Sequence, residues 1–136
     1  MLTGCEKYNL SQIEGKWQVI IDKGIYYERW ISGNSMIWYN SESGIQLWRF
    51  DFDGSIISYK VYDEESNSTP ESDLEETIAS LSKGTIKINV TTNTNGVSYL
   101  MKRINSEKFT PDFTTLDIEN IKDEIKERQY KFFGVK

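Results

Sequence analysis

The feature that most constrains the fold is a series of short segments in which apolar and polar residues alternate, separated by turn signals. After Gly15, the side chains of Trp17, Val19 and Ile21 alternate with their neighbours, and Thr85–Val90 repeats the pattern. A period of two places alternate side chains on opposite faces of a strand, so these segments are typical of half-buried β-strands.

The turns between these segments are short, which indicates antiparallel hairpins. Gly33-Asn34, Asp53-Gly54 and Asn95-Gly96 are two-residue turn signals, because Gly, Asn and Asp tolerate a positive φ angle. A last short strand contains Pro111, so it would lie at an edge or be broken. The strands are expected at 15–22, 25–32, 35–40, 45–52, 55–63, 84–91, 97–104 and about 108–113.

Two segments have helical spacing instead. In 72–82, Ser72 and Glu75 are spaced as a capping box, Gly84 follows as a C-terminal glycine, and the apolar positions are Leu74, Ile78 and Leu81. From residue 116, a C-terminal helix is expected with a stripe of Ile118, Ile121 and Ile125.

Eight strands joined by hairpins predict a mainly β protein. A closed antiparallel up-and-down barrel is favoured over a Greek-key sandwich, because closure leaves no exposed edge and needs no long return connection. A barrel of this size is filled by its own side chains or holds one small ligand. The predicted fold is therefore an eight-stranded barrel with a C-terminal helix and a short inserted helix, and with Trp17, Trp48, Phe50 and Ile57 in its core.

Composition excludes several classes of function. The 136 residues include 21 acidic and 16 basic ones, without a Lys/Arg cluster, which argues against binding to nucleic acid. The chain has no His and one Cys, so His-based catalysis, Cys–His nucleophiles and zinc sites are excluded. The stretch "DFDG" lacks further ligands of a calcium loop and is read as a turn. We expect no enzymatic activity, no cofactor and no metal.

The stretch "LSQIEGKW" before the first strand carries a family resemblance. Ser11 and Glu14 have capping-box spacing, so a short helical turn would lead into Gly15-Lys16-Trp17. Together with "FDFDG" further on, this order over about residues 10–115 resembles the lipocalin-like domains of bacterial lipoproteins, which have a calycin-type barrel. The resemblance implies that Trp17 closes one end of the barrel and that a basic side chain packs across its ring. Arg103 is the first candidate for that side chain and Lys108 the second.

The tetrapeptide "LTGC" at residues 2–5 resembles the cleavage site of a lipoprotein signal peptide. It predicts lipid attachment at Cys5, with residues 1–9 as a tether and 10–136 as a single lipocalin-like domain. The basic and apolar regions of a signal peptide do not precede it, and an accidental tetrapeptide is the alternative. The expected location is the cell envelope, with the protein lipid-anchored on the periplasmic or outer-membrane side.

The many aromatic side chains predict a small, largely apolar ligand in the barrel. In the alternative, the barrel is packed and binds a protein or a glycan through exposed aromatics. Glu28 either anchors a ligand head group or pairs with Arg29 or Arg49. The candidate ligand-binding residues are Tyr26, Glu28, Trp30, Trp38, Trp48, Arg49 and Tyr59.

Overall fold

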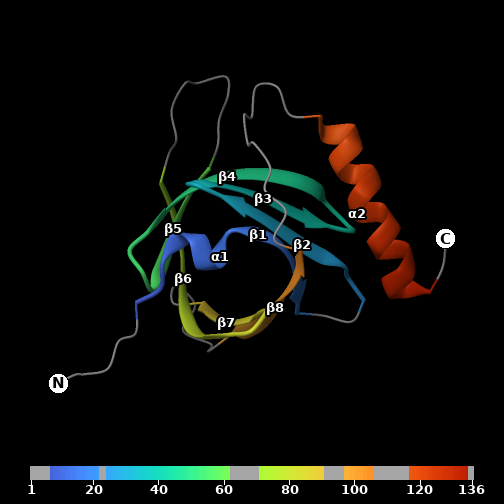
Figure 1. The fold of residues 1–136 in the computed structure, drawn as a ribbon. Helices are drawn as coiled ribbons and strands as arrows, with labels where there is room; N and C mark the ends of the chain where they lie inside the picture. The colour runs from blue at the N-terminus through green and yellow to red at the C-terminus, as the bar shows by residue number, and fades with distance from the viewer. Residues whose placement is uncertain (1–6, 22–23, 62–70, 91–96, 106–116, 135–136) are drawn as a thin grey trace.

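Eight antiparallel strands each pair with the next strand along the chain, and the first pairs with the last, so the sheet closes into a barrel (Figure 1). The fold comes from a computed structural model that describes residues 7–21, 24–61, 71–90, 97–105 and 117–134. The strands are β1 (Gly15–Ile20), β2 (Tyr27–Ser32), β3 (Ser35–Asn40), β4 (Gly44–Phe52), β5 (Ile56–Val61), β6 (Glu71–Ser82), β7 (Thr85–Val90) and β8 (Ser98–Asn105).

Two helices accompany the barrel, α1 (Leu10–Ile13) and α2 (Ile118–Phe133). Helix α1 lies across one end of the barrel, whereas α2 lies on its outer side along β2, β3 and β4 (Figure 1). The sequence-based prediction of a closed eight-stranded barrel with a C-terminal helix is confirmed. The architecture is consistent with a calycin-type fold.

The predicted helix at 72–82 is wrong, because this segment is the strand β6. The register between β6 and β7 shifts between Ile78 and Ser80, as in a β-bulge. Ile78 pairs with Ile88, and Leu81 pairs with Ile86, so both side chains pack against the interior cluster although they are three residues apart. Apolar residues three positions apart are also typical of a helix. The bulge therefore gives β6 the apolar spacing of a helix in the sequence.

With β6, the barrel has eight strands between residues 15 and 105. The strand predicted near 108–113 lies outside the described residues. Gly84, expected at a helix C-terminus, has a φ of 72° in the turn between β6 and β7. A short helix before the first strand is present, but its capping box is formed by Asn9 and Gln12 instead of the expected Ser11 and Glu14. Asp117 caps α2.

The barrel interior is filled by alternate residues of all eight strands, as a closed sheet of this size requires. Of the predicted core residues, Trp17, Phe50 and Ile57 are buried, and Trp48 is partly buried against them. The buried interior side chains are Ile13, Trp17, Val19, Ile31, Met36, Phe50, Ile57, Tyr59, Ile78, Ile86, Ile88, Tyr99 and Met101.

The end of the barrel that carries α1 is closed by Trp17 and Arg103. The Trp17 indole nitrogen donates to the carbonyl of Ile13 at 2.8 Å. The Arg103 guanidinium lies 4.2 Å from the Trp17 ring centroid and donates to the carbonyls of Gln12 and Glu14. The stacking that the family resemblance implies for Arg103 is therefore present, and the same guanidinium binds the end of α1.

Gly15 makes this arrangement possible. Its φ is 129°, and a Cβ at this position would lie 2.5 Å from Nη1 of Arg103 and 3.1 Å from the carbonyl oxygen of Asn105. A larger residue would push the guanidinium away from Trp17. The glycine before Lys16-Trp17 is thus explained by the close approach of β8.

Replacing Arg103 tests this closure. Arg103→Ala removes the cation–π contact and two hydrogen bonds, and we expect the free energy of unfolding to fall by about 1–3 kcal/mol. Urea unfolding followed by circular dichroism measures the change. Lys102→Ala, at an exposed position of the same strand, is the control and should change stability by less than about 0.5 kcal/mol. Equal effects of the two substitutions would contradict the assignment.

Candidate functional site

A buried ion pair crosses the barrel interior. Arg29 of β2 and Glu76 of β6 form two hydrogen bonds, at 2.8 Å and 3.0 Å, and their residues are 7% and 1% exposed. Arg29 also donates to the hydroxyls of Tyr59 and Tyr99, at 3.2 Å and 2.6 Å. Its guanidinium lies 4.4 Å from the ring centroid of Trp38. One side chain of β2 thus contacts residues of four other strands.

The charges of Arg29 and Glu76 compensate each other within the barrel. Burial by itself lowers the pKa of the Arg29 guanidinium, but Glu76 and Tyr59 outweigh it, so the pKa is raised and Arg29 stays charged. Burial raises the pKa of the Tyr59 hydroxyl well above its ordinary value, and this hydroxyl donates a hydrogen bond to the Glu76 carboxylate. The ion pair of Arg29 and Glu76 is therefore a fixed dipole inside the barrel and adds no net charge there.

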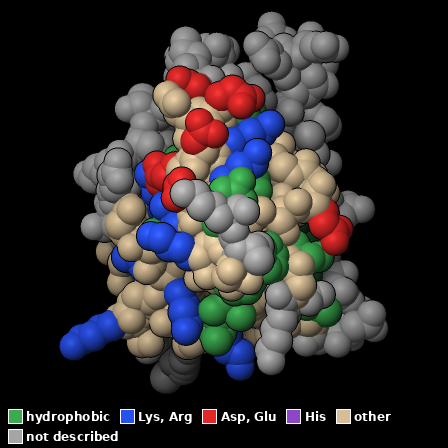
Figure 2. Space-filling model, turned by 90° about the vertical axis from the view of Figure 1, so that its right-hand side faces the viewer, with side chains coloured by type: hydrophobic (Ala, Val, Ile, Leu, Met, Phe, Trp, Pro, Cys, Tyr) green, Lys and Arg blue, Asp and Glu red, His purple; other side chains and the backbone are tan. Residues whose placement is uncertain are grey.

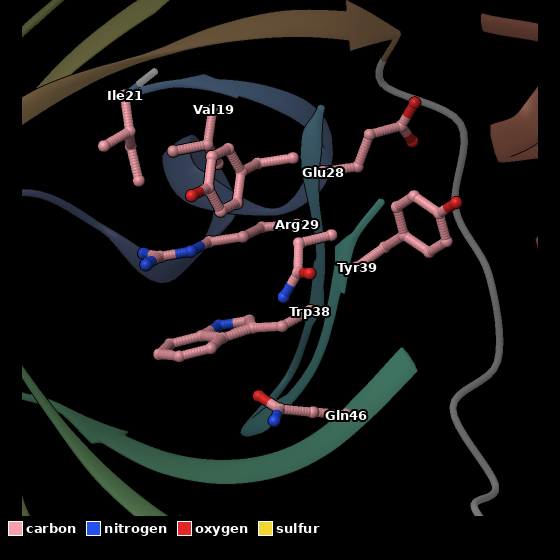
Figure 3. A pocket seen from close by; sticks show the side chains of 9 residues that line it. Val19, Ile21, Glu28, Arg29, Trp38, Tyr39 and Gln46 are labelled. Carbon is pink, nitrogen blue, oxygen red and sulfur yellow. The ribbon is translucent and has the colours of Figure 1, made fainter. Parts of the chain in front are cut away.

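A pocket of about 200 Å³ opens at the barrel end opposite α1, where β1 ends and β2 begins. Figure 3 shows the side chains that line it. Its apolar wall comes from Val19, Ile21, Tyr27 and Trp38. Polar groups are contributed by Arg29, Asn40 and Gln46, and the wall also includes Glu28 and Tyr39. In Figure 3 the side chains of Arg29 and Trp38 point to one side of the strands, whereas those of Glu28 and Tyr39 point to the other.

Glu28 lies on the outer face of the barrel, beneath α2. Its carboxylate accepts two hydrogen bonds from Arg128, at 2.6 Å and 2.8 Å. It also accepts one from the Tyr26 hydroxyl at 2.6 Å and one from the Trp30 indole nitrogen at 2.9 Å. Four donors surround a carboxylate that is 1% exposed, which is the arrangement that a buried charge needs.

One charged residue of β1 extends this contact with α2. Lys16, which is 2% exposed, pairs with Glu124 at 2.9 Å and lies 4.1 Å from the ring centroid of Trp30. Glu124 also pairs with Arg128 at 3.0 Å. Although burial opposes it, hydrogen bonds from Lys16 and Arg128 lower the pKa of Glu124. Burial, together with Glu28, raises the pKa of the Tyr26 hydroxyl.

The apolar contact between α2 and the barrel explains where the outward-facing rings lie. Tyr26, Trp30, Ile37 and Tyr39 form a buried cluster with Ile121 and Ile125 of α2. The aromatic rings on the outer face of this part of the barrel are therefore covered by α2.

The candidate ligand-binding residues are thus divided between two places. Trp38 lines the pocket, and Trp48 and Tyr59 pack behind it, with ring centroids 4.7 Å and 5.0 Å from that of Trp38. The side chains of Tyr26, Glu28 and Trp30 belong to the outer cluster beneath α2. Arg49 bonds to the Ser35 hydroxyl on the strand face opposite to Trp48.

The pairing of Glu28 with Arg29 or Arg49 is wrong, since the partner is Arg128. Glu28 and Arg29 are neighbours on one strand, and neighbouring side chains of a strand point to opposite faces. The interior positions of Arg29 and Glu76 are not among the sequence-based predictions. Arg29 alternates with Tyr27 and Ile31, which is a signal for the interior, but Glu76 lies in the segment 72–82, whose apolar residues have helical spacing.

Within the described ranges, no group of three or more acidic, Cys or His side chains is arranged to hold a metal ion. Neither of the two described helices is long and apolar enough to cross a membrane. Among the buried side-chain N and O atoms of these ranges, the Trp48 indole nitrogen alone has no hydrogen-bond partner.

A double-mutant cycle tests the interior ion pair. Arg29→Met or Glu76→Leu alone leaves a buried charge without its partner, and each should lower the free energy of unfolding by about 3–5 kcal/mol. The double variant removes both charges and should be more stable than either single variant. Urea unfolding of the four proteins gives the coupling energy. Additive effects would show that the two side chains act independently.

The carboxylate beneath α2 gives a second test. Glu28→Gln weakens the charge-assisted bonds to Arg128, and we expect it to lower the free energy of unfolding by about 1–3 kcal/mol. Glu127→Gln, at an exposed position of α2, is the matched control and should cost less than about 0.5 kcal/mol. Thermal unfolding of both variants measures the difference. An unchanged stability of Glu28→Gln would contradict a structural role for this carboxylate.

Comparison with known proteins adds no family assignment to this geometry. No protein-family model, no curated protein and no solved structure matches the chain.

Proposed function

We propose that the barrel binds a small, largely apolar ligand, non-covalently and without catalysis, in the pocket at the end opposite α1. The observation that carries the proposal is the pocket itself: an aromatic and aliphatic wall with three polar side chains from separate strands, Arg29, Asn40 and Gln46. Apolar walls with a few convergent polar groups are typical of small-molecule sites.

The volume limits the size of the ligand. The pocket of about 200 Å³ is smaller than the roughly 300–1,000 Å³ of sites for drug-sized molecules. Behind it, the cluster of Arg29, Glu76, Tyr59 and Tyr99 occupies the interior. A long acyl chain would have to displace this ion pair, so a compact ring-sized ligand fits better.

The polar groups favour a neutral ligand with a hydrogen-bond acceptor. Arg29 and Glu76 neutralise each other, and Asn40 and Gln46 carry uncharged amides. The Trp48 indole nitrogen, a buried donor without an acceptor among the described residues, packs against Trp38 of the pocket wall. An acceptor on the ligand that reached past Trp38 would satisfy this donor.

We also propose that the chain is a lipocalin-like lipoprotein of the cell envelope, anchored through lipid on Cys5. The Gly15-Lys16-Trp17 sequence, the stacking of Arg103 on Trp17 and the closed barrel support the lipocalin-like part. The anchor depends on the "LTGC" sequence, since residues 1–6 lie outside the described ranges. A module that binds a protein or a glycan through strand aromatics is less well supported, because α2 covers Tyr26, Trp30 and Tyr39.

Native mass spectrometry of the purified chain, compared with the denatured mass, tests ligand binding. We then expect benzyl alcohol and acetophenone, two ring-sized compounds with a hydrogen-bond acceptor, to perturb the backbone amide resonances of the pocket residues, whereas palmitate does not. Gln46→Ala should weaken the binding of benzyl alcohol about fivefold, by the loss of one hydrogen bond. Asn89→Ala, an exposed amide on the outer face of β7, is the control.

Two results would contradict this proposal. Saturable binding of palmitate at one site would show that the interior opens to long chains. Failure of every ring-sized compound to perturb the pocket, together with a purified mass without bound ligand, would show that the barrel is solidly packed.

A further inference from the structure

The exposed large hydrophobic side chains of the described residues gather in one place. They are 37–47% exposed, which is far above the 0–9% of the buried hydrophobic residues. We call them the apolar rim, and they come from the end of β1, the start of β8 and the end of α2. The apolar rim consists of Ile20, Ile21, Val97, Leu100, Phe132 and Phe133.

Strand pairing and side-chain contacts connect most members of the apolar rim. Ile20 of β1 is directly opposite Leu100 of β8. A groove of about 250 Å³ is lined by Ile20, Ile21, Ile25, Tyr26 and Phe132, among others, and thus joins the end of β1 to α2. The rings of Tyr26 and Phe132 lie 5.2 Å apart, and those of Phe132 and Phe133 lie 5.1 Å apart.

Among the described residues, three lysines lie beside members of the apolar rim. Lys87 is directly opposite Leu100, Lys102 follows Leu100 two residues later on the same face, and Lys131 precedes Phe132. All three lysines are exposed. Figure 2 shows the face that carries α2, where hydrophobic side chains lie mainly in the lower half and acidic ones mainly in the upper half.

We propose that the apolar rim docks onto a lipid surface that contains anionic phospholipids. Ile, Leu and Phe side chains would enter the boundary between head groups and acyl chains, while the three lysines pair with phosphate groups. Scattered single hydrophobics are common on protein surfaces, but a contiguous group bordered by lysines is typical of an interface. This proposal does not depend on the ligand pocket or on lipid attachment.

The lysines distinguish this occupant from a second copy of the chain. A two-fold symmetric dimer through the apolar rim would bring the same lysine-bordered surface against itself. Like charges around an apolar contact oppose such a dimer, whereas an anionic surface neutralises all three lysines together. A partner protein whose apolar contact surface is bordered by acidic residues is the other alternative, and the test must distinguish it from a lipid surface.

Sedimentation with vesicles tests the proposal on the full chain with Cys5→Ser, so that no covalent lipid contributes. The chain should bind vesicles that contain about one quarter phosphatidylserine, and bind pure phosphatidylcholine vesicles at least about tenfold more weakly. Lys87→Glu with Lys102→Glu should reduce binding to the anionic vesicles about tenfold or more. Leu100→Gln with Phe132→Gln should reduce binding to both kinds of vesicle.

Lys83→Glu is the matched control, because this exposed lysine lies in the β6–β7 turn at the barrel end that carries α1. It should leave binding nearly unchanged, and circular dichroism confirms that each variant is folded. Equal binding to both kinds of vesicle, or equal loss in Lys83→Glu and the rim variants, would overturn the proposal. Absence of vesicle binding would also overturn the proposal. If the chain then formed a dimer that Leu100→Gln with Phe132→Gln dissociates, the apolar rim would be an interface between two copies of the chain.

Discussion

The ion pair between Arg29 and Glu76 is the interaction on which the interior of this barrel depends. A buried guanidinium is stable only when its charge and its donors are matched, and here the partners come from strands on opposite sides of the barrel. Tyr59, Tyr99 and Trp38 complete its surroundings. A shift of β6 by one residue would turn Glu76 to the outside, so the pair also specifies the register. The pocket at the barrel end opposite α1 lies next to this cluster and shares Arg29 with it.

Alternation along β2 builds two different surfaces from consecutive residues. Arg29 faces the interior, while Glu28 and Trp30 face α2 and are held there by Arg128 and Lys16. Both faces of the strand are therefore buried, which explains why the segment is apolar on both sides. The helix is fixed by charge-assisted bonds in addition to Ile121 and Ile125. The barrel wall under α2 is consequently part of the protein core.

Much of this architecture is predictable from local patterns. Period-two segments, the Gly33-Asn34 and Asp53-Gly54 turns, and the Arg103–Trp17 contact follow from residue spacing or from the family resemblance. The β6 strand does not, because its bulge places Ile78 and Leu81 at helical spacing. The partner of Glu28 could not be predicted either, since Arg128 is 100 residues away and only the packing of α2 brings it close. Aromatic residues that face the interior cannot be distinguished in the sequence from those that face α2. The pocket could therefore be located only after the strand pairing and the position of α2 were known.

The pairing of each strand with its neighbour has a consequence for how the chain folds. Seven of the eight strand pairs join consecutive strands and can form as local hairpins, but the β1–β8 pair joins the two ends of the barrel. Pairing β1 with β8 brings together segments that are separated by all the other strands in the sequence. Such a contact between distant segments has a large entropic cost and slows folding. Arg103 and Trp17 lie on these two strands and also hold α1. The contact between Arg103 and Trp17 covers one end of the barrel and also joins β1 to β8. It can form only after these two strands, the most distant pair in the sequence, have paired.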